Sequence, residues 1–135
     1  PEGMEPNVEV IERAEKIARQ TGAQITATND PSEAVTDAGV IYTDIFVSMG
    51  EEHMKDKFAA FEGFQVNEEL VSNANDNYLF MHCLPAHRGE EVTDAVIDSK
   101  NSIVFDQAEN RMWAQMSLLT YMCNPIAWNA YRDLY

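Results

Sequence analysis

The chain has 135 residues, 45% of them hydrophobic and 24% charged, which predicts one folded domain and excludes a disordered segment. Its formal net charge of −14 argues against binding to nucleic acid or to an anionic membrane, because both need clustered Lys and Arg. No apolar run approaches the roughly 20 residues of a membrane span, and the two distant cysteines favour the reducing cytoplasm.

Helical and strand patterns alternate along the chain. The first helical stripe runs over 8–18, with Asn7 as its expected N-cap and Gly22 just past its end. Asp30 is expected to cap a second helix, with Pro31 at its first position and Glu33 reaching back to the cap. The later helices are expected around Phe58, over 67–72, 92–97 and 108–122, and in the tail 126–135. Strands are expected at 25–28, 40–43, 78–81 and 102–105.

This alternation, without hairpin turns, predicts an α/β fold: a doubly wound, Rossmann-like, mostly parallel sheet with helices on both faces. Such a domain normally begins with a strand, whereas residues 1–6 read as a loop followed by a helix. We therefore expect a single domain over 1–135 that lacks its first strand and is incomplete at its N-terminus.

Three polar clusters follow three of the expected strands, at 44–50, 82–89 and 106–111. Parallel strands present their carboxyl ends at one edge of a sheet, so Asp44, Cys83 and Arg111 are expected to meet there. Each has a simpler explanation when taken alone: Asp44 as a turn cap, Cys83 as a buried structural thiol and Arg111 as a surface cation. Convergence at one edge favours a site.

The residue types indicate the chemistry of that site. A carboxylate near a backbone turn suits the head group of an amino acid, and an arginine at the start of a helix suits a phosphate or carboxylate. A cationic and an anionic substrate meeting beside a thiol is an arrangement typical of a transferase. A metal site of His82, Cys83 and His87 is disfavoured because adjacent residues rarely bind one ion and no fourth ligand is offered. The G-x-G-x-x-G pattern of dinucleotide binding does not occur.

The segments 44–52 (DIFVSMGEE), 82–85 (HCLP) and 105–111 (FDQAENR) together resemble ornithine carbamoyltransferase. Residues 1–6 and 28–31 also look like linking segments of that family, so the resemblance extends over nearly the whole chain. The pairing of D-x-x-x-S-M-G with H-C-L-P distinguishes the sequence from aspartate carbamoyltransferases, which carry a different loop in place of the cysteine loop.

The resemblance implies a reaction in which the δ-amine of L-ornithine attacks carbamoyl phosphate, giving L-citrulline and phosphate. It implies that Asp44 binds the ammonium groups of ornithine, and that Ser48 and the backbone of Met49 bind the amino-acid head. Cys83 would lie beside the attacking amine and help to accept its proton. The family is one of arginine biosynthesis in the cytoplasm.

The resemblance also implies a carbamoyl phosphate site made by Cys83, the Leu84 carbonyl and Arg111, with His82 and Pro85 shaping the loop. No metal or organic cofactor is implied, because positioning and charge stabilisation suffice. Partners would be the two small substrates and, in the full-length family, two further copies in a homotrimer. The family's carbamoyl-phosphate domain, with its S-T-R-T and H-P-x-Q motifs, does not occur in the sequence, so we expect the chain alone to be inactive.

Three other interpretations stay open from the sequence. The acceptor amine could be putrescine instead of ornithine, although the Ser48-Met49-Gly50 turn favours an amino-acid head group. The chain could be a stand-alone regulatory module that binds an amino acid without catalysis. It could also be a remnant α/β domain without a function.

Overall fold

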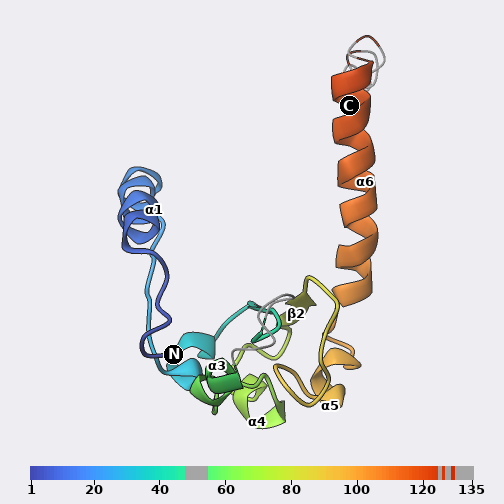
Figure 1. Cartoon of the computed structure of the whole chain (residues 1–135). Helices are drawn as coiled ribbons and strands as arrows, with labels where there is room; N and C mark the ends of the chain where they lie inside the picture. Colours follow the sequence, from blue (N-terminus) through green and yellow to red (C-terminus); the bar gives the residue numbers. More distant parts are fainter. Residues whose placement is uncertain (48–54, 125, 127–128, 130–135) are drawn as a thin grey trace.

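The computed structural model describes residues 1–47, 55–124, 126 and 129. Helices and a parallel pair of strands alternate along the chain, as the α/β prediction requires (Figure 1). The elements, in chain order, are α1 (Val8–Thr21), α2 (Pro31–Val35), β1 (Val40–Thr43), α3 (Lys55–Ala60), α4 (Glu68–Val71), β2 (Leu79–His82), α5 (Asp94–Ile97) and α6 (Val104–Cys123).

Strands β1 and β2 lie side by side in parallel, with Val40 opposite Leu79 and Thr43 opposite His82. This register decides the geometry of the site. Asp44 and Cys83 are the next residues of the two strands, so both leave the sheet at the same edge and at the same level. Neighbouring strands are about 4.8 Å apart, so side chains at matching positions are within contact distance.

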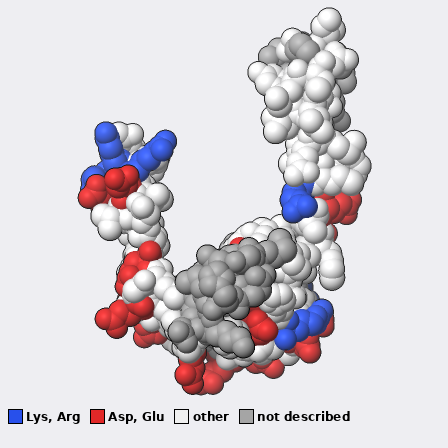
Figure 2. Space-filling model, viewed as in Figure 1, with Lys and Arg blue, Asp and Glu red and all other residues white. Residues whose placement is uncertain are grey.

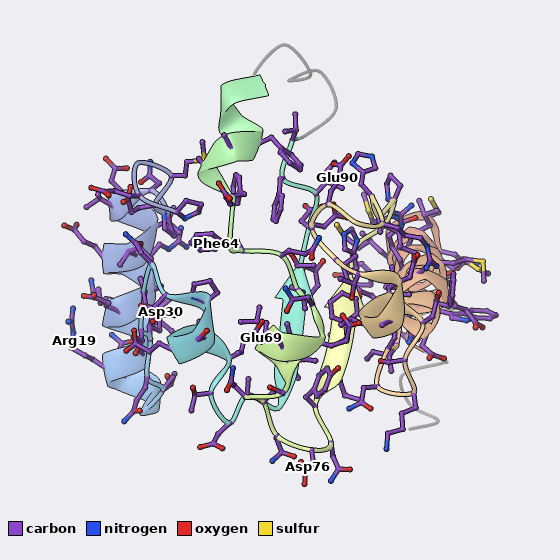
Figure 3. All side chains as sticks on the ribbon, turned by 90° about the horizontal axis from the view of Figure 1, so that it is seen from below. Arg19, Asp30, Phe64, Glu69, Asp76 and Glu90 are labelled. Atoms are coloured by element: carbon purple, nitrogen blue, oxygen red, sulfur yellow. The ribbon has the colours of Figure 1, made fainter. Side chains whose placement is uncertain are left out.

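The core of the domain surrounds these two strands. Phe80 and Val92 are fully buried, and Val96 and Val104 are almost so. The other members of the same cluster are Val35, Ile41, Val66, Leu70, Tyr78 and Ile97. Helix α2 contacts α4. Helix α4 lies below the strands in Figure 1 and in front of them in Figure 3, with α2 to one side. The strand ends are therefore held by a packed interior that is local to them.

The two predicted helix starts are confirmed. The Asn7 side chain accepts a hydrogen bond from Glu9 N–H, and Gly22 adopts the left-handed conformation that ends α1. The Asp30 carboxylate accepts from Ser32 and Glu33 N–H at the start of α2. The predicted contact of the Glu33 side chain back to the cap residue Asp30 is wrong in detail, because Thr28 lies between the two. The Glu33 carboxylate accepts from the Thr28 hydroxyl at 2.6 Å, and Thr28 Oγ1 in turn accepts from Asp30 N–H.

Two predicted strands are wrong. Residues 25–28 form no strand: no described residue pairs with them, and Ile25 is 44% exposed. At 102–105 the pairing with β2 is limited to a bridge between Phe80 and Ser102, and α6 begins at Val104. A run of four apolar residues cannot separate a buried strand from the first turn of a buried helix, which explains the second error.

The outline of the molecule is open. Helices α1 and α6 rise from the same side of the compact part and stand apart from each other (Figure 1). The chain exposes 10154 Å², whereas mass scaling gives roughly 7,100 Å² for a compact monomer of this size. Helix α6 contributes exposed apolar side chains: Met112, Trp113, Leu119 and Met122 are each about half exposed or more.

The expected helix at 126–135 lies largely outside the described residues. Within the described part of the chain, no helix combines the length and the apolar character that crossing a bilayer would require.

Candidate active site

The candidate site begins with the contact between the two strand ends. Cys83 Sγ donates a hydrogen bond to Asp44 Oδ1 at 3.0 Å, and the same carboxylate oxygen accepts from Ile45 N–H at 2.7 Å. The thiol is partly buried and the carboxylate is exposed. A carboxylate and a thiol that are 39 residues apart in sequence therefore share one spot at the carboxyl edge of the sheet.

Gln107, in the first turn of α6, ties the two strands to that helix. Its Oε1 accepts from the backbone N–H of His82 at 3.1 Å, and its Nε2 donates to the Tyr42 hydroxyl at 3.2 Å. One amide side chain thus spans β1 and β2. It fixes the base of α6 against the end of the sheet.

Arg111 lies one helical turn beyond Gln107 and lines the same pocket as Cys83 and Leu84, a cavity of about 510 Å³. The remaining lining residues are Tyr42, Pro85, Gln107 and Ala108. Arg111 is exposed, and no carboxylate among the described residues lies within ion-pair distance of it. Figure 2 shows the acidic surface of the compact part and the small group of basic and acidic side chains at the base of α6. An arginine without a carboxylate partner, on so acidic a chain, is suited to an anionic ligand.

Electrostatics couple the two groups at the strand ends. The hydrogen bond from Cys83 is the largest influence on Asp44 and, with the Ile45 N–H, holds the pKa of that carboxyl below its ordinary value. Burial, followed by the hydrogen bond and the negative charge of Asp44, raises the pKa of the Cys83 thiol. The hydroxyl of Tyr42 opposes this rise. At neutral pH the pair is therefore a carboxylate that accepts a hydrogen bond from a neutral thiol.

The structure brings together Asp44, Cys83, Leu84 and Arg111, which the sequence placed at one edge. Arg111 stands on α6, as the helix predicted over 108–122 implies, but that helix begins earlier than predicted, at Val104. Ser48 and Met49 lie outside the described residues.

Asp44 itself lines a different cavity, of about 480 Å³, and not the one that Cys83 and Arg111 line. Phe46, two residues further on, stacks on Phe61 with ring centroids 4.5 Å apart, and Phe61 meets Phe64 edge to face at 6.2 Å. These rings pack the chain that follows Asp44 against the segment after α3 (the labelled Phe64 marks this region in Figure 3). The direction in which the chain leaves Asp44 is thereby fixed.

Two groups of side chains in the described residues have the residue types of metal ligands: Asp44 with His82 and Cys83, and His87 with Glu90 and Glu91. His82 is not available as a ligand. Its Nδ1 accepts from Leu84 N–H at 2.8 Å and its Nε2 contacts Glu91 Oε1 at 3.1 Å. The first group therefore offers two donors, fewer than a zinc site uses.

Sequence reasoning missed Tyr42, Gln107 and Glu91. The roles of these residues come from hydrogen bonds to residues far along the chain, such as the 25-residue separation of Gln107 from His82. Gln107 carried one usable signal. It lies one helical turn before Arg111, and residues four apart share a helix face.

Comparison with known proteins identifies the family of the chain. Residues 1–122 match the family described as aspartate/ornithine carbamoyltransferase, Asp/Orn-binding domain. The catabolic ornithine carbamoyltransferase of Thermoplasma acidophilum is 59% identical over 120 residues, covering 88% of this chain and 39% of that protein. The anabolic ornithine carbamoyltransferase of Pyrococcus furiosus is 53% identical over 127 residues, covering 93% of this chain and 40% of that protein.

The solved structure of ornithine carbamoyltransferase from Pyrococcus furiosus matches with a TM-score of 0.83 at 55% identity, covering 89% of this chain and 39% of that one. The fold is thus the Rossmann-like α/β fold of carbamoyltransferases. The chain belongs to the aspartate/ornithine carbamoyltransferase family and matches its Asp/Orn-binding domain. It spans about two fifths of the length of the relatives that it matches.

Proposed function

We propose that the chain is the ornithine-binding part of an ornithine carbamoyltransferase. In this reaction the δ-amine of L-ornithine forms a bond to the carbonyl carbon of carbamoyl phosphate. The bond from that carbon to the phosphate oxygen breaks, and L-citrulline and phosphate leave. The observation that carries the proposal is the contact of Asp44 with Cys83 at the end of two parallel strands, beside a pocket that Arg111 also lines.

Asp44 is the proposed partner of the ornithine ammonium groups. It is exposed, its pKa is lowered, and it accepts hydrogen bonds only through Oδ1 among the described residues. Its second oxygen is thus open to a cation. Ser48 and the backbone of Met49 are the proposed partners of the amino-acid head, four and five residues further along the chain.

Cys83, the Leu84 carbonyl and Arg111 are the proposed partners of carbamoyl phosphate. They line one cavity of about 510 Å³, a size suited to a small substrate. The guanidinium of Arg111 matches the geometry of a phosphate group, and the carbonyl of Leu84 can accept a hydrogen bond from the carbamoyl nitrogen. No metal or organic cofactor is needed in this proposal, since orienting an amine against an activated carbonyl and stabilising the phosphate charge lower the barrier.

The coupling of Asp44 to Cys83 suggests how the amine loses its proton. Before ornithine binds, burial and the Asp44 charge keep the thiol protonated. An ornithine ammonium at Asp44 neutralises that charge and so removes one of the causes that raise the pKa of the thiol. More of Cys83 is then ionised, its proton being released to solvent, and the thiolate accepts a proton from the attacking amine, with Arg111 stabilising the negative charge of the thiolate in the same cavity.

The proposal extends to the whole protein. Activity requires a carbamoyl-phosphate domain and a homotrimer, so the chain alone forms no citrulline. The exposed apolar residues of α6 support this view, because a surface of that kind is normally covered by another part of the protein. The two unpaired cysteines support a reducing compartment, the cytoplasm, where the product would enter arginine biosynthesis.

Calorimetric titration with L-ornithine, putrescine and carbamoyl phosphate tests the proposal. We expect saturable binding of ornithine, weaker binding of putrescine, and tighter ornithine binding when carbamoyl phosphate is present. Citrulline formation is expected only when the chain is part of the longer enzyme. If putrescine binds as tightly as ornithine, ornithine is not the specific acceptor substrate. If carbamoyl phosphate leaves the affinity for ornithine unchanged, the result favours a module that senses an amino acid without catalysis.

A further inference from the structure

A fully buried pair of polar side chains lies directly beneath the candidate site. His82, the last residue of β2, and Glu91, beyond the cysteine loop, are both 0% exposed, and His82 Nε2 lies 3.1 Å from Glu91 Oε1. The loop 83–90 connects them, and it carries Cys83 and Leu84. The pair is thus the point where both ends of this loop are joined inside the domain.

The hydrogen bonds assign the protons of the pair. His82 Nδ1 accepts from Leu84 N–H at 2.8 Å, so this nitrogen carries no proton. The proton is therefore on Nε2, which donates to Glu91 Oε1. The same carboxylate oxygen accepts from the backbone N–H of His87 at 2.6 Å. One imidazole and one carboxylate thereby hold two backbone positions of the loop, Leu84 and His87.

This arrangement is unfavourable for the stability of the fold. Burying a polar pair costs free energy that an apolar pair of similar volume would not, and a buried carboxylate needs partners for both oxygens. Among the described residues Glu91 Oε2 has none. A pair that adds little to stability but fixes two backbone groups is better explained by the geometry that it imposes.

We propose that His82 and Glu91 are positioning residues, which hold Leu84 and thereby keep Cys83 Sγ against Asp44 and the Leu84 carbonyl at the pocket. The inference rests on the proposed function for its meaning in catalysis. Neither residue touches the pocket that Cys83, Leu84 and Arg111 line, so the pair acts through the loop.

The loop has a second tether on its outer side. Arg88 donates hydrogen bonds to Asp94 and Asp98 at 2.7 and 2.6 Å. That tether is exposed and screened by solvent, so it constrains the loop less firmly than the buried pair does.

The test compares variants that break or keep each hydrogen bond, in a Cys123→Ser background so that Cys83 is the remaining thiol. His82→Gln keeps a donor near the Nε2 position but loses the acceptor for Leu84 N–H, whereas His82→Asn keeps an acceptor near the Nδ1 position. Glu91→Ala loses the acceptor for His82 and His87, whereas Glu91→Gln keeps an oxygen there. Val96→Ala, in the core on α5, is the control for lost stability alone.

The first readout is the rate of Cys83 alkylation by iodoacetamide without any substrate. We expect His82→Gln and Glu91→Ala to raise the rate about tenfold, the effect of losing one buried hydrogen bond. They should also move its pH profile to lower pH, because a thiol released from burial and from Asp44 ionises more easily. His82→Asn and Glu91→Gln are expected to stay within about threefold of the parent.

The second readout is the dissociation constant for ornithine, which should weaken in the same order. Equal alkylation rates in His82→Gln, Glu91→Ala and Val96→Ala would overturn the positioning role, whatever ornithine does. If the parent does not bind ornithine, the proposed function fails, while the alkylation series still decides whether the pair positions Cys83. Should Glu91→Ala not fold, the comparison of His82→Gln with His82→Asn decides the same question.

Discussion

The compact part of the chain and its two long helices differ in how much of their apolar side chains they bury. Around β2 the side chains of Phe80 and Val92 are fully buried, whereas on α6 Leu119 is 59% exposed and Met122 is 68% exposed. Helix α6 joins the compact part through its first turn, where Val104 is buried and Gln107 bonds to both strands. The remaining turns rise away from it (Figure 1).

This difference divides the candidate site. Asp44 and Cys83 meet because the register of two packed strands places them together, so this part of the proposed ornithine site is preorganised. Arg111 stands on the open helix, so the anion side depends on how α6 is held.

The largest expected effect is a loss of stability caused by a substitution in the compact part. Phe80→Ala should lower the free energy of unfolding by about 3–5 kcal/mol, because it leaves a cavity at a fully buried position. Leu119→Ala on α6 is the matched control, and we expect it to change that free energy by less than about 0.5 kcal/mol. Urea unfolding followed by circular dichroism measures both. Equal losses would mean that α6 packs against the rest of the chain.

A second effect concerns the ornithine side. Asp44→Asn should weaken ornithine binding by about 1.5–3 kcal/mol, the value of a hydrogen bond to a charged group. Calorimetry with the folded variant measures the change. Asp76→Asn is the control, since Asp76 lies in the turn before β2, at the far end of the strands from Asp44 (Figure 3). An unchanged dissociation constant in Asp44→Asn would remove the carboxylate from the site.

A third, smaller effect is the pH dependence of the Asp44–Cys83 coupling. The lowered pKa of Asp44 stabilises the folded state above the ordinary aspartate pKa, and this contribution is lost as the pH falls through the folded value. The raised pKa of Cys83 stabilises it below the ordinary thiol pKa, and this contribution is lost as the pH rises through the folded value.

A double-mutant cycle of Cys83→Ala and Asp44→Asn should therefore give its largest coupling between about pH 4 and about pH 8.5. Solvent exposure of Asp44 limits the coupling to about 1 kcal/mol or less. The measurement is urea unfolding at several pH values. A coupling that stays constant from well below to well above this range would show that the hydrogen bond does not form in solution.

The smallest effect concerns the outer tether of the loop. Arg88→Gln removes ion pairs to Asp94 and Asp98 whose side chains are 74% and 57% exposed. We expect a slight fall in the urea midpoint that disappears at high salt, because exposed ion pairs are screened. A large fall that persists in high salt would place the tether among the main supports of the loop.

Local chemistry made much of this structure predictable. The caps Asn7 and Asp30 act on N–H groups two or three residues away, so the sequence contains both partners. The meeting of Asp44 with Cys83 followed from one topological rule, that parallel strands end at one edge. Where a feature depends on neighbours in sequence or on chain direction alone, residue patterns were sufficient.

The predictions that failed concern features that depend on residues distant in the sequence. Residues 25–28 have strand composition, yet a strand forms only beside a partner, and the described residues supply none. Of the segment 102–105, the last two residues form the start of α6 and not a strand, because Val104 can be buried equally well in a strand or in a helix. No local pattern marks Glu91: its carboxylate is buried against His82, and only the folded loop brings the two together.

The central claim is that Cys83 and Asp44 belong to an ornithine site formed by the strand ends. Nuclear magnetic resonance of isotope-labelled cysteine in the Cys123→Ser chain tests it most directly. Titration with ornithine should move the Cys83 Cβ signal along a saturable curve, and the movement should be lost in Asp44→Asn. A Cys83 signal that stays in place while calorimetry records ornithine binding would contradict the account.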